Sequence, residues 1–395
     1  MNNRKILFVI NNLEIGGIQK SLVNLLNMIN NEYDVSLFIF SRTGAYAGQI
    51  PKNVKIIEAK SILKVLGISY QQSKKLGKIY QLSKILLTLL SRTLGNAFAI
   101  NLALCFEPHL SGYTTAISYM HSAPRKSFYG GTNEFVIRNV TAKEKISFVH
   151  CDYKNYGGDI DYAKKMYEKY DKIAFCSFSC MNTFLDLVPK IKEKAYVVYN
   201  SQDAKHILKQ SKQKPILYNK AHFNIVMVSR IDHGKGIDRA IEAISEYTKN
   251  IDKKIHLHIV GDGILRDDLE NRAQYLQVDQ NVTFYGNADN PYRYMVNADL
   301  LLMTSRHEAA PMVFGEAQIL NLPILTTNTT SAIEMVKDTD SGWICGDSTR
   351  EIVEAILTAK KILGNNKYKQ SCNQPITNKY GVDSFMALIG ESIDE

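Results

Sequence analysis

The sequence lacks a long apolar run, a low-complexity tract and an internal repeat. Its longest uncharged stretches, of which Ala317 to Ile333 is one, are shorter than the roughly 18 to 20 residues that a membrane-spanning helix requires. Ordinary composition without a solenoid period predicts a globular protein. At 395 residues the chain exceeds one typical hydrophobic core, so two domains are expected.

Metal-ligand spacing and a secretion signal are also missing. The short apolar run after Lys5 predicts a first strand rather than a signal peptide. We therefore expect a cytoplasmic protein, either soluble or peripheral at the inner face of the cell membrane. The cysteines are scattered without a partner set of histidines, which predicts free thiols in a reducing compartment; they are Cys105, Cys151, Cys176, Cys180, Cys345 and Cys372.

Positive charge is concentrated in the first half of the chain. Residues 1–200 carry 26 Lys and Arg against 14 Asp and Glu, a net +12, whereas the remaining residues carry 22 against 25, a net −3. A basic half suits an anionic surface or an anionic acceptor. Residues 61–94 predict amphipathic helices that either lie on anionic lipid or pack in the core with solvated lysines; their cations are Lys64, Lys74, Lys75, Lys78, Lys84 and Arg92.

Two successive series of strands and helices predict the fold. Each series has apolar runs typical of buried parallel strands, separated by segments with helical spacing. We expect an α/β protein with two doubly wound Rossmann-like domains facing across a cleft, where ligands usually bind. The predicted parts are an N-terminal domain (1–200), a linker (201–222), a C-terminal domain (223–380) and a final helix (381–395) that crosses back to the first domain.

The stretch from Ser305 to Thr327 predicts a strand end, a loop, a helix and a second strand. The start of such a helix is a ready site for phosphate. Glu308 and Glu316 cannot bind phosphate themselves, so they suit sugar hydroxyls, and the combination suggests a sugar nucleotide. The alternative is that both glutamates are first-turn acids that complement the helix dipole.

A second loop carries cations. In S-R-I-D-H-G-K-G, Arg230 and Lys235 follow a predicted strand, where they can hold a diphosphate or remain ordinary surface charges. The later V-G-D-G is not a dinucleotide fingerprint, because Arg266 occupies the third glycine position, which disfavours a nicotinamide oxidoreductase. In the first domain, Gly16 and Gly17 allow close approach of a ligand or form a simple tight turn.

Taken in order, these motifs resemble the second domain of the retaining glycosyltransferases of family 4, which have the two-domain GT-B architecture. The matching pieces lie within residues 224–346 and are S-R-I-D-x-x-K-G, V-G-D-G, F-Y-G, A-D-L-L-L-M-T-S, E-x(7)-E-A, N-L-P-I-L-T-T and E-M-V-K-D-x-x-S-G-W-I-C. The first half is similar to the family at G-G-I-Q-K-S-L, I-S-F-V-H-C-D and V-V-Y-N-S.

The resemblance implies where the donor phosphates bind. Arg230 and Lys235 match the family's cations on the donor diphosphate. Backbone N–H groups near Met312 and Val313 match the helix start that contacts the phosphates. Because these groups supply the positive charge, the family needs no metal and no cofactor.

The resemblance also implies roles for the sugar and the first domain. Glu316 matches the carboxylate that holds the ribose hydroxyls, and Glu308 matches the one directed at the donor sugar. His150 matches a histidine near the reacting sugar, although a lone histidine can equally be structural. Gly16 and Gly17 match a loop close to the donor phosphate and the acceptor.

The sequence departs from the family pattern beside the first glutamate. Ala309 and Ala310 replace the common Gly-Phe or Gly-Thr pair, which leaves the donor sugar open, and Ser229 replaces a glycine. A D-x-D sequence at Asp159 and Asp161 resembles a metal motif but lies in the wrong domain, so we interpret it as unrelated to metal binding.

The resulting prediction is a retaining hexosyltransferase that moves a sugar from a nucleotide-diphosphate donor, such as a UDP-sugar, to a hydroxyl acceptor. The expected acceptor is a glycan or a polyprenyl-diphosphate-linked saccharide in surface polysaccharide synthesis. An anionic membrane surface is the other expected partner, and nucleic acid is not expected. The alternatives are a UDP-sugar epimerase of similar shape and a non-catalytic basic adaptor at a membrane surface.

Overall fold

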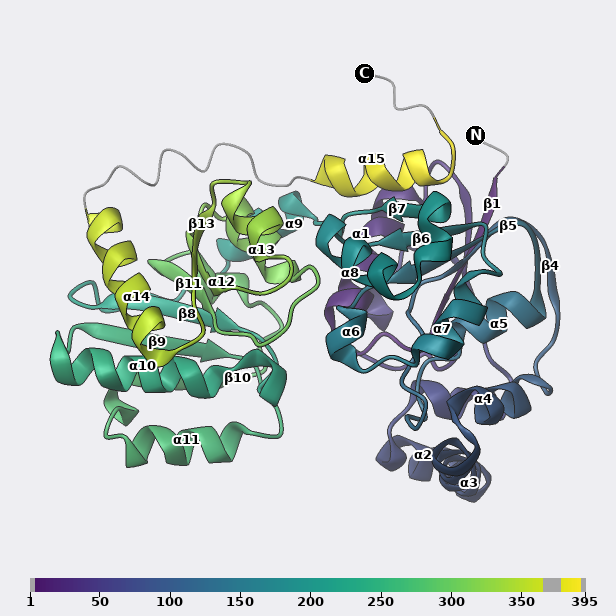
Figure 1. The fold of residues 1–395 in the computed structure, drawn as a ribbon, viewed down its shortest axis with the longest axis horizontal. Helices are drawn as coiled ribbons and strands as arrows, with labels where there is room; N and C mark the ends of the chain where they lie inside the picture. Colours follow the sequence, from purple (N-terminus) through teal and green to yellow (C-terminus); the bar gives the residue numbers. More distant parts are fainter. Residues whose placement is uncertain (1–3, 365–377, 392–395) are drawn as a thin grey trace. The chain divides into compact units, whose positions relative to one another are not determined.

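A computed structural model describes residues 4–364 and 378–391, and the chain separates into two compact units. The first unit combines Met1–Ser201 with Lys379–Glu395, and the second is Gln202–Asn378. Each unit contains one parallel sheet with helices packed on it (Figure 1). The predicted class, two doubly wound α/β domains, is therefore confirmed.

The first unit has a seven-stranded parallel sheet in the order β3-β2-β1-β4-β5-β6-β7. Its strands are β1 (Lys5–Ile10), β2 (Asp34–Ile39), β3 (Lys55–Glu58), β4 (Leu110–Ser118), β5 (Val140–Val149), β6 (Lys172–Phe175) and β7 (Ala195–Val197). Its helices are α1 (Gly17–Ile29), η1 (Ala47–Gln49), η2 (Ile62–Gly67), α2 (Tyr70–Leu76), α3 (Lys78–Leu94), α4 (Asn96–Leu104), α5 (Thr132–Asn139), α6 (Tyr153–Tyr156), α7 (Ile160–Tyr167), α8 (Phe178–Leu187), η3 (Pro189–Lys194) and α15 (Asn378–Leu388).

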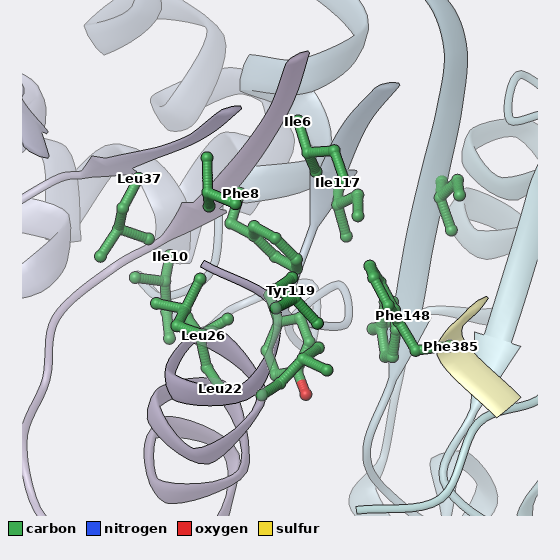
Figure 2. Close-up of a cluster of buried hydrophobic side chains, with 14 of the residues drawn as sticks. Ile6, Phe8, Ile10, Leu22, Leu26, Leu37, Ile117, Tyr119, Phe148 and Phe385 are labelled. Atoms are coloured by element: carbon green, nitrogen blue, oxygen red, sulfur yellow. The ribbon is translucent and has the colours of Figure 1, made fainter. Parts of the chain in front are cut away.

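The core of the first unit includes a side chain from the end of the chain. Figure 2 shows Phe385 of α15 among the side chains of the central strands. The ring of Phe385 stacks on Phe8 of β1 at a centroid distance of 5.9 Å. Lys172 Nζ also donates to the carbonyl oxygen of Leu388 at 2.5 Å. Helix α15, drawn in yellow in Figure 1, is thus an integral part of the first unit.

The second unit has a six-stranded parallel sheet in the order β10-β9-β8-β11-β12-β13. Its strands are β8 (Phe223–Val228), β9 (Ile255–Val260), β10 (Val282–Gly286), β11 (Leu300–Met303), β12 (Ile324–Thr327) and β13 (Gly342–Cys345). Its helices are α9 (Ala204–Ser211), η4 (His233–Lys235), α10 (Ile237–Asn250), α11 (Arg266–Tyr275), η5 (Asp279–Asn281), α12 (Tyr292–Met295), α13 (Met312–Ile319), η6 (Ile333–Lys337) and α14 (Thr349–Gly364).

The stretch expected as a linker, residues 201–222, is partly structured. Its first half contains α9, whose Ile207 is buried in the core of the second unit. Gln202, just before this helix, is also buried and donates to the carbonyl oxygen of Met312 at 2.9 Å. The lysine-rich composition did not indicate this helix, because only Ile207 and Ser211 of its residues are buried.

Helices α2, α3 and α4 group together on one side of the first unit (Figure 1). Of the side chains of α3, only Leu87 and Ser91 are buried. Lys84 differs from the predicted basic face, because its Nζ donates to the carbonyl oxygen of Val65 at 2.7 Å and lies 4.9 Å from the ring centroid of Phe128. Burial lowers the pKa of Lys84 to about 8. Across residues 4–364 and 378–391, every helix is too short or too polar to cross a membrane.

Candidate functional site

The strand order of the second unit reverses between β8 and β11, and two loops leave the sheet there. In an open α/β sheet this switch point, at the carboxyl ends of the strands, is where ligands bind. The first loop, residues 229–236, follows β8, and the second, residues 304–311, follows β11. Both loops carry residues that were singled out from the sequence. Because β8 and β11 are paired neighbours, the two loops begin side by side.

The two loops are fixed to each other by hydrogen bonds to backbone carbonyl oxygens. Arg306 donates its N–H to the carbonyl oxygen of Gly234 at 2.8 Å, and Thr304 Oγ1 donates to that of Gly236 at 2.7 Å. Gly236 has φ +59°, and a Cβ there would lie 2.1 Å from the carbonyl oxygen of Thr304. A glycine is therefore required both for the left-handed conformation and for the close approach.

Arg306 reinforces this contact with its side chain. Its guanidinium donates to both carboxylate oxygens of Asp238 at 2.7 and 3.1 Å and to the carbonyl oxygen of His233 at 2.8 Å. Such a bidentate pair fixes orientation as well as distance. Sequence reasoning missed Arg306, although it lies inside the analysed stretch, because its partner Asp238 belongs to the other loop's helix.

Lys235 and Glu308 meet where the two loops converge. Lys235 Nζ lies 2.6 Å from Glu308 Oε1, and the two side chains are only 21 % and 10 % exposed. The pair joins a cation predicted to hold phosphate to a carboxylate predicted to face a sugar. An anionic ligand at this point would meet a lysine that is already oriented.

Arg230 lies in the same loop as Lys235 but is directed differently. Its side chain is 70 % exposed, and its nearest acidic partner is Asp232, at 3.3 Å. Asp232 also accepts from the N–H of Gly234 at 3.0 Å, which shapes the loop. Arg230 therefore has the freedom to move onto a ligand, because an exposed ion pair constrains it weakly.

Helix α13 begins beside Glu308 and offers its N-terminus. Its N-cap is Pro311, which has no side-chain acceptor, and its first turn contains no acidic residue. The first N–H groups of a helix lack intrahelical partners and attract anions. These groups belong to Met312 and Val313, the first two residues of the helix. One turn further, Glu316 is 3 % exposed, so it is a buried carboxylate rather than a solvated first-turn acid.

Three buried hydroxyl groups at the strand ends were not anticipated from the sequence. Ser229 Oγ follows β8, Ser305 Oγ follows β11 and Thr329 Oγ1 follows β12, and each is shielded from solvent without a hydrogen-bond partner. Buried polar groups usually find partners. Orphaned hydroxyls at the carboxyl ends of these strands are therefore available to a ligand's oxygens.

The predicted residues of the first unit lie at the ends of its own strands. Gly16 is the N-cap of α1 and Gly17 its first residue, in the loop after β1. A Cβ on Gly16 would lie 2.5 Å from Gln19 Oε1. Gln19 Nε2 in turn donates to Asn12 Oδ1 at 3.3 Å, so the glycine makes room for this contact.

His150 follows β5 and has a neighbour that sequence reasoning missed, His121 after β4. His150 Nε2 and His121 Nδ1 are both buried without a partner. The His150 ring lies 4.8 Å from that of Tyr119, and the His121 ring 4.7 Å from that of Tyr156. Burial lowers the pKa of His150 to about 3, with a contribution from His121, and that of His121 to about 4. Both rings are therefore neutral at physiological pH.

The D-x-D sequence has a structural explanation. Asp159 is the N-cap of α7 and accepts from the N–H of Tyr162 at 3.0 Å. Asp161 lies in the first turn of that helix, where an acidic residue complements the dipole. Within residues 4–364 and 378–391, no group of three His, Cys, Asp or Glu residues is arranged to hold a metal ion.

The second unit carries all of the predicted donor residues except Gly16 and Gly17, which lie in the first unit. The switch point of the second unit brings together Arg230, Lys235 and Glu308 with the start of α13 and Glu316. Residues 209–378 match the model of a protein family described as glycosyl transferases group 1. This segment, less than half of the chain, is similar to a group 1 glycosyl transferase domain. The family prediction made from the motifs is therefore confirmed.

Curated relatives extend the similarity. A protein of the cps region of Klebsiella pneumoniae is 29% identical over 201 residues, which cover 48% of this chain and 52% of the relative. The chain thus spans about half the length of this relative. A Campylobacter jejuni protein is 22% identical over 361 residues, 91% of this chain and 88% of the relative. Its name is GalNAc-alpha-(1->4)-GalNAc-alpha-(1->3)-diNAcBac-PP-undecaprenol alpha-1,4-N-acetyl-D-galactosaminyltransferase.

Solved structures share the fold over nearly the whole chain. Anabaena HepE in complex with UDP and glucose superposes with a TM-score of 0.70 at 15% identity, covering 98% of this chain and 99% of that one. WaaG, a glycosyltransferase involved in lipopolysaccharide biosynthesis, gives a TM-score of 0.62 at 16% identity, with 98% and 100% coverage. The architecture is the GT-B fold that the motifs predicted.

Proposed function

We propose that the protein is a retaining glycosyltransferase that moves a sugar from a nucleotide diphosphate, with UDP the favoured nucleotide, to a hydroxyl of a glycan or lipid-linked acceptor. The observation that carries the proposal is the contact of Lys235 with Glu308 beside the uncapped start of α13. Cations, helix N–H groups and a buried carboxylate occur there within one switch point. A sugar diphosphate needs this combination.

The leaving group is stabilised by the second unit. During transfer, the bond from sugar C1 to the diphosphate oxygen breaks, the diphosphate takes the electron pair, and C1 bonds to the acceptor oxygen. The acceptor proton passes to the departing phosphate. Lys235, Arg230 and the first N–H groups of α13 would neutralise the charge that develops on the diphosphate, which is usually the largest single catalytic contribution. No metal or cofactor is needed in this scheme.

The carboxylates would hold the parts of the donor that carry hydroxyls. Glu316, buried in α13, suits the ribose, because a carboxylate accepts hydrogen bonds from two adjacent hydroxyls. Glu308 suits the sugar, next to the diphosphate held by Lys235. In the first unit, His150 would present a neutral imidazole nitrogen to a sugar hydroxyl, and the loop at Gly16 and Gly17 would approach the ligand closely.

The acceptor class is supported by the relatives. The Campylobacter protein's name specifies a polyprenyl-diphosphate saccharide, and the Klebsiella relative belongs to a cps region. We extend this to an acceptor in surface polysaccharide synthesis, with the protein acting on the cytoplasmic face of the membrane. The excess of positive charge in the first half of the chain suits a diphosphate-linked lipid.

A surface of the first unit supports membrane association. The α3 apolar face consists of Ile79, Leu82, Leu86 and Leu89, which are 74 %, 66 %, 55 % and 58 % exposed. These residues recur at helical spacing on one side of α3. Exposed lysines of α2 and α3 lie nearby in the chain. An apolar stripe flanked by cations is the pattern of a helix that lies in an anionic lipid interface.

Thermal stabilisation by nucleotides tests the donor proposal. UDP, GDP, ADP and CMP are added to the full chain and to a Glu316→Gln variant, and a ligand that binds the folded state raises the melting temperature. UDP should stabilise the wild type and stabilise the variant less.

Transfer of radiolabelled sugar to a membrane extract, with NMR of the product anomer, then tests transfer and retention. Interconversion of sugar nucleotides without an acceptor would instead show an epimerase, and no nucleotide binding would favour an adaptor.

A further inference from the structure

A pocket in the first unit is lined by none of the residues proposed to bind the donor. Its volume is about 150 Å³. The start of α4, the loop after β4, helix α5 and the start of α7 each contribute to its wall. The residues that matter most are Asn96, Ala97, Arg125, Glu134 and Tyr162.

Two residues of the pocket lining each have a side-chain oxygen that is buried without a partner. Glu134 is 5 % exposed, and its Oε2 makes no hydrogen bond, whereas Oε1 accepts from the hydroxyl of Tyr162 at 2.8 Å. Asn96 is also 5 % exposed, and its Oδ1 likewise has no partner. An unpaired buried acceptor lowers stability by roughly 1–3 kcal/mol. Two of them around one small cavity indicate a place built for hydrogen-bond donors.

The remaining contacts hold these two residues in position. The N–H of Asn96 donates to the carbonyl oxygen of Arg125 at 2.6 Å, and its Nδ2 donates to that of Tyr129 at 2.7 Å. Gly95 has φ +100°, which lets α3 end and α4 begin at the pocket wall. With Nδ2 occupied, the orientation of the Asn96 amide is fixed and its oxygen remains available.

We propose that this pocket binds one sugar ring of the acceptor through its hydroxyl groups. The inference rests on the proposed transferase function and adds a subsite to it. A volume of about 150 Å³ admits a small polar ligand, and vicinal hydroxyls suit two acceptors at neighbouring points of a wall. A hydroxyl group both donates and accepts. Its O–H group would therefore donate to the unpartnered oxygen of Glu134.

Residues of the pocket wall are close in sequence to the histidine pair and to its ring contact. Ala123, in the pocket wall, lies two residues after His121 on the same loop. Asp159, also in the wall, follows Tyr156, whose ring packs against His121. A sugar in the pocket would thus lie next to the segments that carry the unpartnered imidazole nitrogens. This arrangement fits an acceptor whose next ring or reacting hydroxyl reaches the histidines.

Binding of simple glycosides to the full chain tests the proposal. The probes are methyl α- and β-pyranosides of glucose, galactose, N-acetylglucosamine and N-acetylgalactosamine, followed by saturation-transfer NMR. Glu134→Gln replaces the free acceptor oxygen by a donor without changing side-chain size. Ala97→Met fills the cavity from its half-buried rim. The matched control is Asp161→Asn, which makes the same change from carboxylate to carboxamide at an exposed position of α7.

We expect at least one glycoside to bind the wild type and the control with equal affinity. The same glycoside should bind each pocket variant at least about tenfold more weakly, which corresponds to the loss of one charged hydrogen bond. Failure of every glycoside to bind, or undiminished binding to Ala97→Met, would overturn the subsite. Stabilisation by UDP is measured on the same samples. If UDP stabilises all of them while the glycosides do not bind, the subsite alone is wrong. If UDP fails as well, the proposed function is wrong.

Discussion

Lys235 Nζ lies 2.6 Å from Glu308 Oε1, so the cation and the carboxylate predicted to serve different parts of the donor are paired. The ion pair is mostly shielded from solvent. Removing one partner of such a pair leaves an uncompensated charge. The pair therefore orients Lys235 before a ligand arrives, and a diphosphate would replace or share the carboxylate.

Replacing Lys235 by alanine should lower kcat about 100- to 1000-fold, the effect of removing one group that stabilises a developing anion. Binding of UDP should weaken less, because the charge on the leaving diphosphate grows during the reaction. Steady-state kinetics with a UDP-sugar measure both effects. The control is Lys249→Ala, an exposed lysine near the end of α10. A kcat within threefold of wild type in the Lys235 variant would show that the lysine does not act on the leaving group.

Replacing Glu316 by glutamine should weaken nucleotide binding about tenfold, because one carboxylate hydrogen bond to a hydroxyl is worth roughly 1.5–3 kcal/mol. The variant should leave kcat nearly unchanged at saturating donor, since the ribose does not react. Titration calorimetry with UDP measures the change in Kd. Asp268→Asn, an exposed acid in the first turn of α11, is the control. Equal UDP affinity of wild type and Glu316→Gln would remove the ribose role.

The strand–loop–helix–strand unit of residues 305–327 was predictable because each part has a local signal. Strand β12 is a short run of Ile, Leu and Thr, helix α13 is mostly apolar, and the structure buries both. The two-sheet architecture follows from repetition of such units. Local patterns were thus sufficient for element type and order.

Contacts between distant segments were not predictable. Arg306 is 68 residues from Asp238, and no local sequence pattern around either residue predicts the pair. Lys84 looked like part of a solvated basic face, yet the structure directs it inward onto the carbonyl oxygen of Val65. His121 and Glu134 gain their significance only from burial, which depends on the packing of several elements at once.

The two buried histidines should make the first unit sensitive to acid. Because their pKa values fall to about 3 and 4 from 6.5, the folded state keeps them neutral where the unfolded chain takes up protons. Above pH 6.5 the histidines are neutral in both the folded and the unfolded state, so they do not change the free energy of unfolding. As pH falls from 6.5 toward 3, the folded state loses stability progressively. At pH 5 the loss is up to about 2 kcal/mol for each histidine.

Hydrogen exchange of peptides from β5, corrected for intrinsic rates, measures this loss between pH 7 and pH 5. The variant His121→Gln/His150→Gln should show a smaller decrease in protection than the wild type. The single tryptophan, Trp343, lies in the second unit, so its fluorescence monitors that unit separately. An identical pH dependence in the variant would mean that the histidines do not titrate on unfolding.

The α3 apolar face should bind anionic membranes. Substituting both Leu82 and Leu89 by glutamate should lower partitioning onto phosphatidylglycerol vesicles at least about tenfold, because burial of each leucine contributes roughly 1.5–3 kcal/mol. Vesicle sedimentation measures the partitioning. The control is Leu217→Glu, an 87 % exposed leucine of the second unit. Equal binding of wild type to anionic and neutral vesicles at low salt would contradict the role of the flanking cations.

Replacing Gly236 by alanine should disrupt the junction of the two donor loops. The added Cβ would lie 2.1 Å from the carbonyl oxygen of Thr304 at a φ of +59°, so both the backbone and the contact with the second loop must shift. We expect a loss of at least about 1–2 kcal/mol in the second unit's free energy of unfolding, monitored by Trp343 fluorescence in urea. Gly364→Ala, with no atoms within 4 Å of the added Cβ, is the control. The Gly236 variant should also lose UDP binding, because Lys235 and Glu308 no longer meet. Full stability with lost UDP binding would mean that the glycine serves ligand binding alone. Retained stability together with retained binding would contradict the steric argument.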